Sequence, residues 1–236
     1  MQRLRIRFCR GEEVKFISHL DIIRLWQRAL RRAGVPLAYS EGFNPHPRIS
    51  LAVPLAIGVT SEGELMDIVC SKWVSPHWFT SAVSQQLPAG IKILQVYAIT
   101  PTQPSLQSQV SYAEYRVEVE TEKGQEEIEA GLRSLLSAER LPWQHRRDTG
   151  IRSYDLRALI DNLWLIDYHA PYCTLGMKLR CDTSGSGRPE QVTAALGFPD
   201  YPRSMHRTKL LLGTSKTDGE EGKKSRNSGT AGTELH

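Results

Sequence analysis

The chain of 236 residues has few cysteines and no long apolar run. Four cysteines in a chain of this length do not form the disulfide scaffold of a small secreted domain, so we expect reduced thiols that are mostly buried. No apolar stretch approaches the ~20 residues that span a bilayer, and the alternating, arginine-rich N-terminus does not resemble a signal peptide. These absences predict a cytoplasmic protein with no membrane segment.

The signatures of common metal and nucleotide sites are also missing. The sequence contains no H-x-x-x-H pair, no paired C-x-x-C and no P-loop lysine pattern, so we predict no structural metal and no cofactor. A glycine-rich turn with Gly185, Gly187 and Arg188 precedes a predicted helix. Such a turn can contact a phosphate, and a plain turn is the alternative interpretation.

The best-marked element is a helix at residues 18–33. Ser18 fits the N-cap position, and Asp21, three residues later, is placed for a capping box. Gly34 fits the left-handed position after the helix, and Pro36 prevents continuation. The apolar face of the helix repeats at helical spacing and consists of Ile22, Trp26, Ala29 and Ala33.

The opposite face of this helix is cationic. Its arginines follow the same spacing, offset by two residues, and are Arg24, Arg28, Arg31 and Arg32. Only Asp21 stands at a useful pairing distance. Residues 1–48 contain ten basic and four acidic residues, a net charge of +6, whereas the whole chain carries +4. A local cationic field favours a polyanion such as RNA, and a solvated helix face is the alternative.

The loop that follows, at residues 39–48, is crowded with polar groups. Gly42 permits a left-handed turn, and two prolines hold Asn44 and His46 in extended conformations. We predict acid–base or catalytic roles for His19, Asp21, Glu41 and His46. We predict nucleic-acid contacts for Arg24, Arg28, Arg31, Arg32, Phe43, Asn44, Arg48 and Arg188. A proline-stiffened connector is the alternative for the loop, and a His19–Glu41–His46 metal site lacks any supporting spacing.

The order of patterns along the chain predicts an α+β protein with two tandem ferredoxin-like (βαββαβ) units. In the first, the predicted strands are 4–9, 49–57, 64–70 and 91–99, and the helices are 18–33 and 76–87. In the second, the predicted strands are 112–120, 153–160, 174–181 and 207–212, and the helices are 125–138 and 189–197. The units take residues 1–100 and 111–212, with a linker at 101–110. We expect disorder at 213–236, which has almost no apolar residues.

Two sequence runs carry a family resemblance. SHLDIIRLWQRALRRAGVPLAYSEGFNPHPRIS, followed by PLAIGVTSEGE, closely resembles the radical SAM-linked protein family, a domain of unknown function that stands alone or follows a radical-SAM module. The resemblance is close over residues 1–100 and looser to about 212, where Asp155, Leu156 and GSGRP match. It implies a radical-SAM protein as partner and a connection with RNA. The chain lacks the C-x-x-x-C-x-x-C that binds the radical-SAM cluster, so such chemistry would come from the partner.

These features leave two main functions and a weaker third. The first is an RNA-binding or substrate-presenting subunit that works with a radical-SAM enzyme. The second is an RNA-modifying or RNA-processing enzyme with His19, Glu41 or His46 as acid–base groups, because the predicted architecture is similar to that of tRNA pseudouridine synthases and CRISPR repeat-processing endoribonucleases. The third is an adaptor whose basic helix binds an acidic protein surface.

Overall fold

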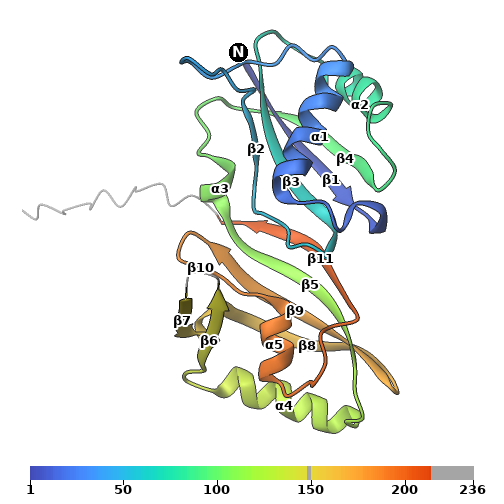
Figure 1. Ribbon diagram of the computed structural model, residues 1–236, viewed down its shortest axis with the longest axis vertical. Helices are drawn as coiled ribbons and strands as arrows, with labels where there is room; N and C mark the ends of the chain where they lie inside the picture. Colours follow the sequence, from blue (N-terminus) through green and yellow to red (C-terminus); the bar gives the residue numbers. More distant parts are fainter. Residues whose placement is uncertain (148–149, 214–236) are drawn as a thin grey trace, which may run out of the picture.

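One large mixed sheet takes strands from both halves of the chain, from β1 near the N-terminus to β11 near residue 212 (Figure 1). The computed structural model describes residues 1–147 and 150–213, and this part has the predicted α+β class with five α-helices. The strand order is β10-β9-β5-β11-β3-β1-β4, with β2 paired to β3 and β8 paired to β9. Apart from Gly213, the predicted disordered tail at 213–236 lies outside the described residues.

The first half has the predicted order of elements. They are β1 (Gln2–Arg10), the 3-10 turn η1 (Glu12–Val14), α1 (His19–Arg32), β2 (Ile49–Leu51), β3 (Thr60–Cys70), α2 (Pro76–Ser84) and β4 (Ile91–Ile99). Every pairing in the order β4-β1-β3-β2 is antiparallel. The strand predicted at 49–57 is only three residues long. It stops because Pro54 has no N–H for a ladder and Gly58 turns the chain at φ +84°.

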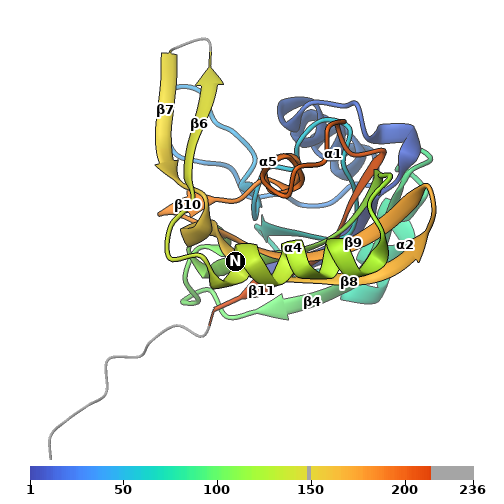
Figure 2. The same cartoon turned by 90° about the horizontal axis from the view of Figure 1, so that it is seen from below.

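The second half contains more strands than predicted. Its elements are α3 (Leu106–Gln109), β5 (Val110–Glu120), α4 (Gln125–Ser137), β6 (Pro142–Arg147), β7 (Gly150–Asp155), the 3-10 turn η2 (Arg157–Leu159), β8 (Ile160–His169), β9 (Tyr172–Asp182), β10 (Gly185–Ser186), α5 (Pro189–Ala195) and β11 (Ser204–Leu212). The β6–β7 hairpin stands away from the large sheet (Figure 2). The predicted linker, 101–110, includes α3, whose Leu106 is buried.

One predicted strand in this half was wrong. Residues 153–160 do not form a single strand, because β7 ends, η2 turns the chain and β8 begins within this range. The sequence of β8 gave no alternating pattern, since the register of its pairing with β9 shifts twice, after Ile160 and after Leu165. Each shift moves the following side chains to the other face of the sheet, which removes the period of two.

The last strand, β11, joins the two halves into one sheet. It pairs antiparallel with β5 along most of its length and parallel with β3 only at two positions. A Cβ atom on Gly63 of β3 would lie 2.8 Å from the carbonyl oxygen of Thr208. Glycine is therefore required where the strands of the two halves approach each other.

Two apolar cores lie against the sheet, one in each half. In the first half, Leu4, Ile6 and Phe8 on one face of β1 pack with apolar residues of α1 and α2. The indole of Trp26 is fully buried there and meets Phe8 edge-on, with ring centroids 5.0 Å apart. On the opposite face of β1, the side chains of Arg3 and Arg5 donate hydrogen bonds to the chain between β4 and β5. The helices of the first half therefore share one face of the sheet.

The cysteines agree with the prediction of reduced, mostly buried thiols. All four cysteines are free thiols, and three of them are buried. No helix in residues 1–147 and 150–213 is both long and apolar enough to cross a membrane.

Candidate nucleic-acid interface

Both ends of α1 are fixed by local hydrogen bonds. The Oγ of Ser18 accepts the backbone N–H of Asp21 at 3.2 Å, which confirms the predicted N-cap. The carboxylate of Asp21 accepts from the Ser18 hydroxyl at 2.7 Å instead of from its backbone N–H, as a capping box would require. At the other end Gly34 has φ +71°, and the N–H of Val35 reaches the carbonyl of Leu30 at 3.0 Å. This closure is a Schellman motif.

The cationic face of α1 lies in solvent because the apolar face of the helix packs on the core. Ile22, Trp26 and Leu30 are buried, while the four predicted arginines are exposed. The Arg24 guanidinium donates to Asp21 at 3.0 Å. The hydrogen bond from Ser18, and after it the one from Arg24, lowers the pKa of the Asp21 carboxyl. The four arginines therefore share a single acidic neighbour on their own helix.

The remaining arginines of this face differ in how they are held. Arg32 donates to the side chain and the backbone carbonyl of Gln86, at 3.1 and 2.7 Å. Arg28 and Arg31 make no hydrogen bond or ion pair within the described part of the chain. Two guanidinium groups on α1 are thus open to an anionic ligand.

The loop after α1 is exposed, and hydrogen bonds between Ser40 and His46 close it at its base. The N–H of Ser40 reaches the carbonyl of His46 at 2.8 Å, and the N–H of His46 donates to the Ser40 hydroxyl at 3.0 Å. Gly42 turns the chain with φ +119°, and Phe43 beside it is completely exposed. The other predicted residues of the loop are exposed as well, and are Glu41, Asn44, His46 and Arg48.

The structure does not bring His19 together with Glu41 and His46. His19 begins α1 beside Arg10, at the end of β1, whereas the loop is paired near the start of β1, where Gln2 faces Cys70 and Leu37 bridges Cys70. Eight residue steps of β1 separate these two ends, a distance of about 27 Å. The predicted acid–base group therefore does not form one site. Within the described residues, no group of three His, Cys, Asp or Glu side chains is placed to hold a metal ion.

His19 lies instead next to a buried charged cluster. Burial and the positive charge of Arg10 lower the pKa of His19, with Glu64 acting in the opposite direction. Arg10 is itself buried and donates to the carbonyl of Ile17 at 2.9 Å, just before the N-cap of α1. This hydrogen bond ties the end of β1 to the segment that leads into α1.

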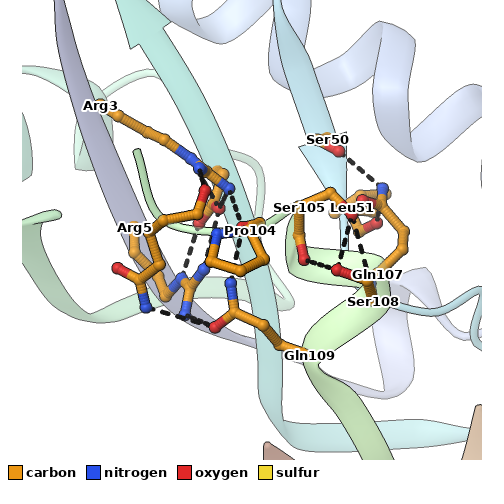
Figure 3. A network of polar contacts seen from close by, with 11 residues as sticks. Arg3, Arg5, Ser50, Leu51, Pro104, Ser105, Gln107, Ser108 and Gln109 are labelled. Carbon is orange, nitrogen blue, oxygen red and sulfur yellow. Dashed lines mark hydrogen bonds and ion pairs between the residues drawn. The ribbon is translucent and has the colours of Figure 1, made fainter. Parts of the chain in front are cut away.

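Part of the N-terminal positive charge is internal, which the sequence count did not reveal. Arg5 is fully buried and pairs with Asp67 at 2.8 Å, and Arg3 pairs with the same carboxylate at 2.7 Å (Figure 3). Arg3 also donates to the carbonyl of Gln103, and Arg5 donates to the side chain of Gln109. These arginines hold the chain before β5 against the sheet. The exposed arginines of residues 1–48 are Arg7, Arg24, Arg28, Arg31, Arg32 and Arg48.

Arg188 lies in the second half of the chain, far from α1 in the sequence. It lines a cavity of about 720 Å³ between residues 52–59 and the turn that leads from β9 to α5. Its guanidinium is half-exposed and 3.8 Å from Glu190. Asp155 lines the same cavity, and its Oδ1 accepts the backbone N–H groups of Leu141 and Arg157. This carboxylate fixes a turn.

Sequence reasoning did not identify the exposed indole of Trp73. Trp73, in the turn between β3 and α2, is 76% exposed. Its neighbours Ser71, Ser75 and Pro76 marked a turn, but nothing in the local pattern indicated that the indole would be left in solvent.

The comparisons with known proteins establish the family. The family model described as "Uncharacterized protein conserved in bacteria (DUF2344)" matches residues 3–189. The chain belongs to the DUF2344 family. That description contains no reference to radical-SAM enzymes, so this link stays a prediction for the DUF2344 chain. No match was found among curated proteins.

Solved structures show only distant similarity to this DUF2344 member. A Cbf5–Nop10–Gar1 complex has 8% identity and a TM-score of 0.47 over 89% of this chain and 48% of that chain. An archaeal box H/ACA Nop10–Cbf5 complex has 9% identity and a TM-score of 0.45 over the same shares. A putative glycine cleavage system transcriptional repressor has 13% identity and a TM-score of 0.25, over 83% and 88%. The chain spans about half the length of the Cbf5-complex chains, and at these scores the likeness carries no functional argument.

Proposed function

We propose that the DUF2344 chain binds RNA through α1 and the loop at 39–48. The observation that carries this proposal is the exposed arginine face of α1, on which Arg24 forms an ion pair with Asp21, and Arg28 and Arg31 form none within the described chain. Arginine presents a planar fork that matches phosphate oxygens, and uncompensated guanidinium groups along one helix provide a field for a polyanion. Exposed Arg48 extends the same charge into the loop.

The role that fits this surface is binding or presentation of an RNA substrate. His19 and the loop that carries His46 lie at opposite ends of β1, so the alternative acid–base mechanism has no assembled group at α1. The proposed partner is a radical-SAM enzyme, which would supply the chemistry. That part of the proposal rests on the family resemblance of residues 15–62, and the proposed compartment is the cytoplasm.

We further propose that the two halves are tandem ferredoxin-like units, at residues 1–100 and 111–212. The strand order β4-β1-β3-β2 in the first half has a counterpart in the order β11-β5-β9-β8 of the second. In this interpretation the β6–β7 hairpin is an insertion between the first helix and the second strand of the repeat.

Equilibrium binding of a fluorescent RNA tests the function. We expect Arg24→Glu/Arg28→Glu to weaken binding at least about tenfold, because hydrogen bonds to charged groups contribute ~1.5–3 kcal/mol each. A matched control, Arg133→Glu/Arg140→Glu, makes the same charge change at exposed positions of the second half. It should bind within about twofold of wild type. Equal losses in both variants would show that only net charge matters and would contradict a site on α1.

Co-purification tests the proposed partner. A tagged DUF2344 chain should retain the radical-SAM protein of the same cell through washes that remove RNA. Turnover of that enzyme with full activity in the absence of the chain would contradict the presenting role.

A further inference from the structure

Three exposed aromatic side chains lie in two segments at one end of the first half. Phe43 is fully exposed, Trp73 is 76% exposed and Tyr39 is 47% exposed. Phe43 and Tyr39 belong to the loop after α1, whereas Trp73 belongs to the turn after β3. Leaving apolar rings of this size in water forgoes the stabilisation that their burial would give.

Backbone hydrogen bonds connect these two segments at their bases. The N–H of Ser71 reaches the carbonyl of Pro36 at 2.8 Å, and the N–H of Val69 reaches the carbonyl of Arg48 at 3.0 Å. Leu37 also forms a bridge with Cys70. The loop and the turn therefore leave the sheet at the same end, which is the end where the N-terminus lies in Figure 1.

Exposed cationic side chains belong to the same two segments and to the end of α1. Arg48 closes the loop, Lys72 precedes Trp73, and both are exposed. Arg31 lies in the last turn of α1, a few residues before the loop begins. Exposed aromatic rings next to cations are the combination that binds single-stranded nucleic acid, because every base has a face that can stack while the cations follow the phosphates.

We propose that Tyr39, Phe43 and Trp73, with Arg48 and Lys72, form a stacking surface for unpaired bases, so that the substrate of this chain is a single-stranded segment of RNA. The proposal rests on the RNA-binding function above and names its substrate class. A duplex cannot satisfy this surface, since its bases are stacked on one another and present only their edges in the grooves. The arginine face of α1 would contact the phosphates that lead to these bases.

The experiment compares one RNA strand in two states. A labelled 12-nucleotide RNA of mixed, non-self-complementary sequence is titrated alone and after annealing to its complement, with anisotropy as the readout. We expect wild type to prefer the single strand, and Phe43→Ala/Trp73→Ala to lose at least about tenfold for the single strand and less than about twofold for the duplex. Ile57→Ala/Tyr201→Ala removes two other exposed apolar side chains and is the matched control.

The outcomes separate this inference from the proposed function. Wild type that binds neither RNA contradicts the RNA-binding function itself. Wild type that binds both states equally, or an aromatic variant that loses both equally or neither, leaves RNA binding intact and overturns the stacking surface. Because the substituted side chains are exposed, both variants should melt within a few degrees of wild type. A variant that keeps single-strand affinity but loses a co-purifying protein would assign the surface to a protein partner instead.

Discussion

Glu64 is expected to be the side chain whose neutralisation costs the most stability at the junction of the two halves. Its carboxylate pairs with Arg207 of β11, at 2.9 Å to Nε and 2.5 Å to Nη2, and both side chains are almost completely inaccessible. Buried Arg10 is the next cation: burial lowers the pKa of its guanidinium, and the negative charge of Glu64 opposes that shift. One carboxylate therefore balances two buried guanidinium groups.

Glu64→Gln keeps the volume of the side chain and removes its charge, which leaves Arg10 and Arg207 uncompensated. Breaking a buried ion pair by removing one partner costs about 3–5 kcal/mol, a large part of the ~5–15 kcal/mol stability of a typical domain. With urea slopes of roughly 1–3 kcal/mol per molar, the midpoint should fall by about 1–3 M. The double variant Glu64→Gln/Arg207→Met should recover part of this loss, because one of the two unpaired charges is then absent.

Urea denaturation followed by tryptophan fluorescence measures this effect. The control is Glu129→Gln on α4, whose pair with Arg133 is exposed and 3.7 Å long. It should change the free energy of unfolding by less than about 0.5 kcal/mol. If Glu64→Gln also lost less than about 1 kcal/mol, the buried cluster would not hold the halves together as argued.

Three further predictions concern single residues. The pKa of His19 is lowered in the folded chain, so below the ordinary histidine pKa of 6.5 the unfolded chain binds more protons than the folded one. Stability should therefore fall as the pH drops below 6.5. His19→Gln should flatten this part of a plot of the urea midpoint against pH. Gly176→Ala places a Cβ within 2.5 Å of the Trp164 indole, and calorimetry should show a loss of at least ~1–3 kcal/mol. Burial raises the thiol pKa of Cys173 and of Cys181 to about 11. A maleimide at pH 7 should therefore label these two cysteines only after denaturation.

Local signals predicted α1 well, and long-range contacts limited the prediction elsewhere. Ser18, Gly34 and the apolar period lie within one segment, and each performs its predicted structural role in the helix. Arg5, by contrast, reaches a carboxylate 62 residues away, so its burial could not be predicted from its neighbours. The net charge of residues 1–48 consequently overstated the charge available to a ligand.

Prediction of the candidate site from the sequence was limited by three-dimensional distances that the sequence does not show. His19 and His46 flank the same helix, but a helix of 14 residues separates its ends by about 21 Å, and the two side chains lie at opposite ends of β1. Trp73 was missed because its exposure depends on where the turn after β3 leaves the sheet. The arginine face of α1 was predictable because a helical period and two clear helix ends determine it.

The salt dependence of RNA affinity tests the central claim most directly. For single-stranded RNA, the slope of log K against log salt changes by about 0.7 for each phosphate contact. We predict that Arg24→Glu/Arg28→Glu reduces the magnitude of this slope by about 1.4 or more, while Arg133→Glu/Arg140→Glu leaves it unchanged. An identical slope for wild type and the α1 variant would contradict phosphate binding by this helix.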